Sequence, residues 1–351
     1  INKEAIQTSN QDGDTRQLSE LIENNQLQTW HGDLEWLQVG DEIEGRKKNA
    51  RSGSSVSLSS DGSIVAIGSW NDRTIGKQRG SVAVYQSVNN SWTQLGNILN
   101  GDNNYDRFGG QVSLSADGSR LAVGTARDDD GGTWAGSVSI YELQSGTWTK
   151  LGSNIDGVSA DDRAGISLAL SGDGSTIIVG AERGHTQNRG YAGIYEWDGT
   201  SWDLIGSLIK GTQKKEYSGR SVAISEDGSR VAIGSWAFDS NGNDRGRVRV
   251  YDNVGGTWEE KFEIIGEKKS VIYHNYFIGN NPKKWKSNVP IFNSIRYNNL
   301  YDNIDLNYYS HGGKLKYDFI VHPKADIKSL QIQYKGIDSI YLKSGHLILK
   351  T

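Results

Sequence analysis

One pattern that recurs four times at intervals of about 56 residues constrains the fold of this 351-residue chain more than any other feature. Asp-Gly pairs return at steps of 56, 56 and 54 residues, and a separate series of tryptophans keeps nearly the same interval. Two series in step indicate one structural unit repeated along the chain. The repeat aspartates are Asp61, Asp117, Asp173 and Asp227, and the tryptophans are Trp36, Trp92, Trp148, Trp202 and Trp258.

Each period divides into four short strands. In the second period, residues 112–114 and 121–124 flank the Asp-Gly pair and predict a hairpin with positive backbone angles in its turn. Residues 136–141 and the tryptophan segment 148–152 supply the third and fourth strands. Four antiparallel strands per period are typical of a propeller blade, whose sheet is buried against its neighbours. We therefore expect an all-β fold, a β-propeller with four clear blades and about five if the ring closes, with the repeat tryptophans packed between blades.

Composition narrows the class of partner. The chain has 44 glycines and 11 tryptophans but only 35% hydrophobic residues, which fits many short strands joined by tight turns. Its net charge of -4 offers no overall attraction to nucleic acid or to an anionic membrane, and no apolar run approaches the roughly 18 residues of a membrane span. Cysteine and methionine are both absent. A signal peptide removed before Ile1, or a shortened start, would explain the missing methionine.

Residues 108–124, followed by 136–141, resemble the FG-GAP-like propeller repeats of bacterial surface proteins, which are distantly similar to the blades of integrin α-chains. The resemblance covers residues 36–258. It implies an extracellular or cell-surface protein that works by binding, although such blades also occur in enzymes and scaffolds. The integrin-type blade holds calcium in an acidic loop, whereas a four-residue turn stands at that place here. We therefore expect that no cofactor is required.

The composition changes after Trp258. Residues 259–351 carry 14 Lys and Arg against 9 Asp and Glu, and residues 1–258 carry 24 against 33. We expect an extension over 1–33 with a short helix at 15–27, propeller repeats over 34–258, and a β-rich domain over 259–351. The last part resembles the N-terminal domain that precedes SBBP-type β-propeller repeats in bacterial cell-surface proteins, through residues 275–290, 295–297, 300–309 and 315–326.

Two kinds of loop residue are candidates for ligand binding. Oxygen-bearing side chains alternate in 239–244, as they do around Ca²⁺, at Asp239, Asn241, Asn243 and Asp244. The loop lacks a distal glutamate, so a solvated Asx-rich turn is the alternative, and Asp128–Asp130 is a weaker metal candidate. Exposed aromatic rings could stack on sugars or fold down as lids, and the candidates outside the repeat series are Trp70, Trp134 and Trp236.

Arginines also recur at the repeat interval. Arg51, Arg107 and Arg163 each stand two residues before a glycine, and Tyr217 takes the place in the fourth repeat. Repetition at the blade period favours a structural ion pair or a carbonyl cap between blades over ligand binding.

Three functions follow as hypotheses. The first is a binding or adhesion module that recognises a glycan or a surface protein through blade-end loops. The alternatives are a structural subunit of an extracellular assembly and a polysaccharide-active enzyme, although the six histidines show no catalytic or metal-ligand spacing. The chain has five tryptophan segments but four sets of the other strands. We therefore expect residues 36–40 to pair with the stretch 262–297 and close the ring, since an unpaired edge invites self-association.

Overall fold

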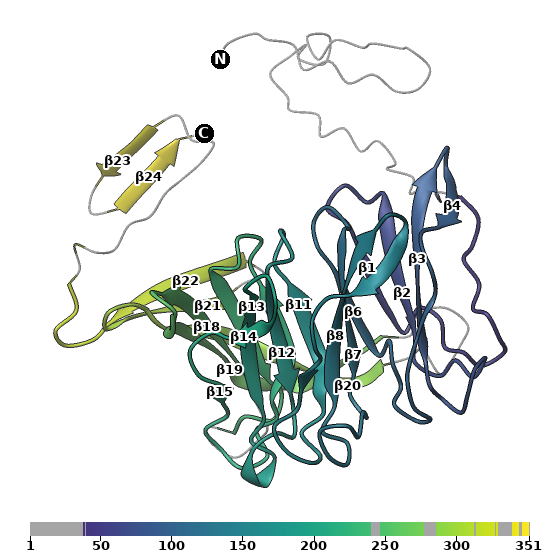
Figure 1. Cartoon of the computed structure of the whole chain (residues 1–351). Coiled ribbons are helices and arrows are strands. Elements are labelled where there is room, and N and C mark those ends of the chain that lie inside the picture. Colours follow the sequence, from purple (N-terminus) through teal and green to yellow (C-terminus); the bar gives the residue numbers. More distant parts are fainter. Residues whose placement is uncertain are drawn as a thin grey trace, which may run out of the picture. The chain divides into compact units, whose positions relative to one another are not determined.

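The computed structural model describes residues 38, 40–239, 246–276, 286–311, 314–326, 328, 339–343 and 346–350. Within this part the chain is all-β, with one short 3-10 helix, Thr186–Asn188. Trp36 and the predicted helix at 15–27 lie outside the described residues. Four antiparallel sheets follow one another along the repeat region (Figure 1), so the predicted all-β fold with four blades is confirmed.

Each blade follows the same strand order. Blade 1 contains β1 (Ser55–Leu58), β2 (Ile64–Ser69), β3 (Ser81–Val88), β4 (Ser91–Gln94) and β5 (Leu99–Asn100). Blade 2 contains β6 (Gln111–Leu114), β7 (Arg120–Thr125), β8 (Ser137–Gln144), β9 (Thr147–Lys150) and β10 (Ile155–Asp156). Blade 3 contains β11 (Ala164–Leu170), β12 (Thr176–Ala181), β13 (Tyr191–Trp197), β14 (Trp202–Leu204) and β15 (Ile209–Lys210). Blade 4 contains β16 (Ser218–Ile224), β17 (Arg230–Ser235), β18 (Arg247–Val254) and β19 (Thr257–Tyr276).

The Asp-Gly pairs form the turn between the first two strands of every blade. In blade 1, Asp61 Oδ1 accepts hydrogen bonds from the Ser59 hydroxyl at 2.6 Å and the Ser63 N–H at 2.9 Å. These bonds lower the pKa of Asp61 to about 2, because they favour the carboxylate. Gly62 takes the positive φ, at 71°, whereas the aspartate does not. Of the two turn residues, the glycine alone has the predicted positive backbone angle, because hydrogen bonds to the Asp61 side chain fix the rest of the turn.

Three of the repeat tryptophans, Trp148, Trp202 and Trp258, pack between neighbouring blades. Trp148 of blade 2 is 3% exposed and joins a cluster with Ala66 and Val84 of blade 1. Its Nε1 donates to the Leu95 carbonyl of blade 1 at 3.0 Å, and Trp202 of blade 3 donates in the same way to Leu151 at 3.1 Å. The hydrophobic core of the array therefore consists of layers between neighbouring sheets, and each layer includes one tryptophan ring.

The fourth sheet continues beyond the repeats. After β19 it adds β20 (Lys286–Tyr301), β21 (Ile304–His311) and β22 (Lys314–Val321), each paired with the strand before it. The described residues of 262–297 thus extend blade 4 and form no separate fifth blade, which corrects the five-blade expectation. Gln38 and Gly40 lie in no strand. Strand β19 runs through Trp258 without a break, so the ladder continues across the composition change.

Asp305 is a buried charged residue in the described part of the C-terminal strands. Asp305, 4% exposed, accepts bonds from Arg296 Nε at 3.1 Å and from the Asn299 N–H at 2.7 Å, and lies 2.7 Å from His322 Nε2. Strands β23 (Ser339–Lys343) and β24 (His346–Lys350) pair with each other. Among the described residues, no helix has the length and hydrophobicity to cross a membrane.

Candidate binding site

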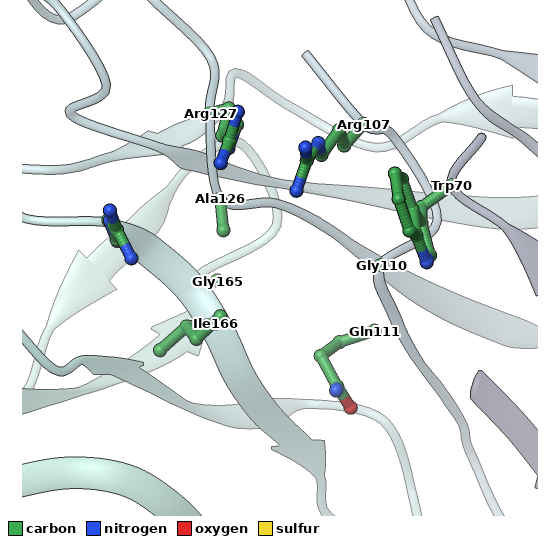
Figure 2. Close-up of a pocket in the computed structure, with 9 residues that line it drawn as sticks. Trp70, Arg107, Gly110, Gln111, Ala126, Arg127, Gly165 and Ile166 are labelled. Carbon is green, nitrogen blue, oxygen red and sulfur yellow. The ribbon is translucent and has the colours of Figure 1, made fainter. Parts of the chain in front are cut away.

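Two loops of each blade meet at the same end of its sheet. One loop precedes the first strand and the other follows the second, and these two strands are antiparallel neighbours. Where the loops of blades 1, 2 and 3 come together they line a half-open cavity of about 220 Å³ (Figure 2). Its lining residues are Trp70 of blade 1, Arg107, Gly110, Gln111, Ala126 and Arg127 of blade 2, and Arg163, Gly165 and Ile166 of blade 3.

An unusual backbone conformation fixes where the side chains of two of these arginines begin. Arg107 and Arg163 have φ of 63° and 59°, in the left-handed region that costs a non-glycine residue about 1–3 kcal/mol. A loop of the preceding blade stabilises this strained conformation. The Arg107 N–H donates to the Gln78 carbonyl at 3.2 Å, and the Arg163 N–H donates to the Trp134 carbonyl at 3.2 Å. The arginines therefore stand where the fold places them.

The cavity is positively charged. In Figure 2 the Arg107 and Arg127 guanidinium groups lie close together, and neither forms an ion pair with a described residue. Arg163 has weak partners in its own blade, Glu182 at 3.5 Å and Asp161 at 3.6 Å. Burial lowers the pKa of Arg107, and repulsion by the neighbouring Arg127 and Arg163 cations lowers it further. Buried Nε atoms of Arg107 and Arg163 also lack a hydrogen-bond acceptor among the described residues.

These contacts change the interpretation of the repeated arginines. The sequence favoured an ion pair or a carbonyl cap between blades. The carbonyl bonds exist, but they are made by the backbone N–H groups and not by the side chains. The guanidinium group of Arg107 lies 4.4 Å from the Trp70 ring centroid, and that of Arg51 lies 5.5 Å from the same ring. Because the Arg107 guanidinium group forms no ion pair with any described residue, the ion-pair expectation is wrong for Arg107.

The three loop tryptophans lie in loops of three different blades. Trp70 lines the cavity, where its ring contacts two arginines. Trp134 is 41% exposed, with the Arg127 guanidinium 5.2 Å from its ring, and Trp236 is 56% exposed and stacks on Tyr217 at 5.2 Å. Only Trp70 therefore belongs to the cavity, and each ring already has a cationic or aromatic neighbour from its own end of the array.

Only some of the predicted metal ligands lie among the described residues. Asn241, Asn243 and Asp244 lie outside the described residues, and the Asp239 N–H donates to Gln213 Oε1 at 3.3 Å. Asp128 is buried and accepts a bond from the Ser137 hydroxyl, and Asp129 Oδ1 caps the Trp134 N–H at 2.7 Å. Within the described part of the chain no three His, Asp or Glu side chains are grouped as metal ligands.

Buried acids beside the repeated arginines escaped the sequence analysis. Asp106, Asp162 and Glu216 are 4%, 3% and 0% exposed, and each directly precedes Arg107, Arg163 or Tyr217. Burial, aided by Asp128, raises the pKa of Asp106 to about 6. The same repeat alignment could have found these acids. It does not single out Arg127 and Gln111, because neither residue type recurs at its place in all the repeats.

Comparison with known proteins gives two family matches. Residues 92–141 match the FG-GAP repeat, and residues 246–351 match a domain of unknown function, DUF7948. No curated protein matches the chain.

Similar solved structures include the hydrazine synthase of Kuenenia stuttgartiensis, with 16% identity over 80% of this chain and 70% of that chain and a TM-score of 0.43. A protein of Bacteroides uniformis assigned as a 6-phosphogluconolactonase has 12% identity over 85% and 77%, also with a TM-score of 0.43. A protein of Agrobacterium tumefaciens assigned as TolB has 19% identity over 60% and 65%, with a TM-score of 0.35. At such TM-scores the likeness bears on neither activity nor ligand. The chain is an array of propeller-type blades that contains an FG-GAP repeat and a segment matching DUF7948.

Proposed function

We propose that this chain is an extracellular or cell-surface binding module that recognises an acidic glycan at the cavity between blades 1, 2 and 3. The observation that carries the proposal is the convergence of Arg107, Arg127 and Arg163 on one cavity, with no ion-pair partner for the first two among the described residues. The whole chain is net negative at -4, so this positive charge is local. A bound anion would relieve the repulsion between the cations.

The donor geometry suits carboxylate or sulfate. An arginine fork presents parallel N–H groups that match two oxygens of one anionic group, and such charged bonds are about twice as strong as neutral ones. Three forks from two blades surround the cavity. Since the left-handed backbone at Arg107 and Arg163 fixes where their side chains begin, part of the ordering cost of binding is already met by the fold.

The size and the remaining lining favour a sugar unit over a peptide side chain. A cavity of about 220 Å³ is smaller than the roughly 300–1,000 Å³ of pockets for drug-sized ligands, so it fits one unit of a longer glycan. Gln111 can both donate to and accept from sugar hydroxyls. Ile166 and the edge of Trp70 offer apolar contact for the C–H face of a sugar ring.

The lining supports binding over catalysis. Its nine residues include no carboxylate, histidine, lysine or hydroxyl group, whereas glycan hydrolysis needs a proton donor beside a nucleophile or base. The polysaccharide-active enzyme therefore remains the less favoured function, and it would have to use another part of the molecule.

Isothermal titration calorimetry on the full chain tests the proposal. The probes are an oligogalacturonate, a sulfated oligosaccharide, a neutral dextran oligosaccharide and a poly-glutamate peptide. We expect saturable binding of at least one acidic sugar and none of dextran. Arg107→Gln and Arg127→Gln should each weaken it about 10- to 100-fold, since a hydrogen bond to a charged group contributes about 1.5–3 kcal/mol.

Arg120→Gln is the matched control. It removes the same charge from the other end of β7, where Arg120 pairs with Glu142 at 3.2 Å, and its affinity should stay within about twofold of the wild type. Equal loss in all three variants would indicate general electrostatics, and equal binding of poly-glutamate would exclude a glycan-specific site. Release of new reducing ends during the titration would instead favour the enzyme.

A further inference from the structure

Neighbouring blades are joined by two kinds of backbone contact, and each kind occurs three times. At the Asp-Gly end, the Ser60 N–H donates to the Ala116 carbonyl at 2.8 Å, and the next two links run from Ala116 to Gly172 at 2.8 Å and from Gly172 to Glu226 at 2.7 Å. At the other end, parallel bridges join Gly80 to Phe108, Gly136 to Ala164 and Gly190 to Ser218. Each blade thus offers one face to the blade before it and a different face to the blade after it.

Blade 1 leaves the first of these faces open. Val56 and Leu58 of β1 are 62% and 58% exposed, whereas their equivalents Val112 and Leu114 in blade 2 are 6% and 7% exposed. No backbone N–H in the described part of the chain donates to the Ser60 carbonyl. A Cβ built on Gly62 would meet no atom within 4 Å, but one on Gly118 would lie 2.6 Å from Ile64 of the preceding blade. Within the described part of the chain, this face of blade 1 is therefore uncovered.

Blade 4 leaves the opposite face open. Ala223 of β16 is exposed, and Ala232 and Val248 are half-buried, although their equivalents in blade 1, Ala66 and Val82, are fully buried. The Glu226 N–H, last in the chain of interblade bonds, has no backbone acceptor among the described residues. Strands β20 to β22 pair one after another beyond β19, at the edge of the sheet.

Arg230 shows what the open face is shaped to contact. Its equivalent in blade 2, Arg120, pairs through Nε with Glu142 and donates from Nη1 to the Gly174 carbonyl of blade 3 at 3.1 Å. Arg230 repeats the first contact with Asp252 at 2.6 Å. Its Nη1 has no acceptor within the described structure. The residue equivalent to Gly174 in blade 1 is Gly62. The matching acceptor in a next blade would therefore be the Gly62 carbonyl, which lies on the uncovered face of blade 1.

We propose that the blade 4 face of one copy binds the blade 1 face of a second copy, head to tail. In this contact the Glu226 N–H donates to the partner copy's Ser60 carbonyl and Arg230 donates to its Gly62 carbonyl. Val56 and Leu58 of the partner copy cover Ala232 and Val248. The occupant is a second copy because this chain itself carries both halves of the interblade contact, in the register that its three internal contacts already use.

A heterologous contact of this kind either closes into a ring or grows into a filament, depending on the rotation between copies. Sedimentation velocity on the full chain, from roughly 1 to 100 µM, detects association with dissociation constants in the micromolar range. We expect the mean mass to rise with concentration. Leu58→Asp and Ala223→Glu should each weaken association at least tenfold. Both residues are exposed in the monomer, so neither variant should change the melting temperature by more than about 2 °C. The matched control, Val88→Asp, alters an equally apolar exposed residue of the same sheet outside the contact and should associate like the wild type.

The decisive experiment is a mixture of two variants. Leu58→Asp lacks a working blade 1 face and Ala223→Glu lacks a working blade 4 face, so an equimolar mixture should form a one-to-one complex although each variant alone stays monomeric. A wild-type monomer at every concentration overturns the proposal. So does association that both variants leave intact, or a mixture that stays monomeric.

Discussion

Replacing Trp148 by alanine tests the packing on which the array depends. The side chain is 3% exposed, and burying an aromatic ring removes about 150–250 Å² from water. At about 25 cal/mol per Å² this burial contributes about 4–6 kcal/mol, which is an upper value because an unfolded chain already buries part of its surface. The variant would also leave the Leu95 carbonyl without its indole donor. We expect a loss of about 3–5 kcal/mol in the free energy of unfolding, as for large aromatic truncations in cores.

Urea unfolding followed by far-UV circular dichroism measures this loss. Trp202→Ala is the control, because Trp202 makes the same Nε1 bond, to Leu151 at 3.1 Å, but is only half-buried. Its loss should be clearly smaller, which separates burial from hydrogen bonding. A change below about 1 kcal/mol for Trp148→Ala would refute the reasoning and would mean that the tryptophan series does not hold the blades together.

Three further predictions follow from the same structure. Gly118→Ala should lower the melting temperature more than Gly62→Ala, since both glycines have φ near 70° but only at Gly118 would the added methyl carbon lie within 3 Å of a neighbouring side chain; equal effects would mean that backbone strain alone decides. The raised pKa of Asp106, about 6, means that the folded state binds this proton more tightly than the unfolded chain, so the stability it contributes is present at low pH and is lost as the pH rises through about 6. Asp106→Asn should therefore reduce the gain in unfolding free energy between pH 7 and pH 5 by roughly 1 kcal/mol relative to the wild type, and an unchanged pH profile would contradict the assignment. Chelator should lower the melting temperature by less than about 10 °C, because we expect that the fold requires no bound metal ion. A larger drop would contradict this expectation, since a bound structural ion stabilises the folded state by mass action.

The repeat could be predicted from the sequence because it depends on interactions between residues close together in the chain. An aspartate that caps its own turn, a glycine with positive φ, and alternation of Val and Ser on short strands need no information from distant residues. Asp117 and Gly118 therefore predicted the hairpin and, by their spacing, the four blades. In this turn the glycine alone has the predicted positive backbone angle, because the Ser115 and Ser119 contacts to Asp117 replace a second one.

The cavity could not be read in the same way. Arg107 was found by its repeat interval, but Arg127 stands where the other repeats have Asn71, Arg183 or Ala237. Nothing local says that Arg127 lines a cavity together with residues of blades 1 and 3. Three blades have to stack before these side chains share one space. The ion-pair expectation for Arg107 failed for the same reason, since the assembled loops decide whether a carboxylate lies within reach of its guanidinium group.

The sequence by itself therefore determined the class, the repeat length and the turns, because these depend on contacts within a few residues. Tertiary structure decided where charge accumulates and which faces stay open. Val56 and Val112 occupy the same place in their repeats, yet one is 62% and the other 6% exposed. The difference lies only in whether another blade stands beside them, and that is settled by stacking over more than fifty residues of chain.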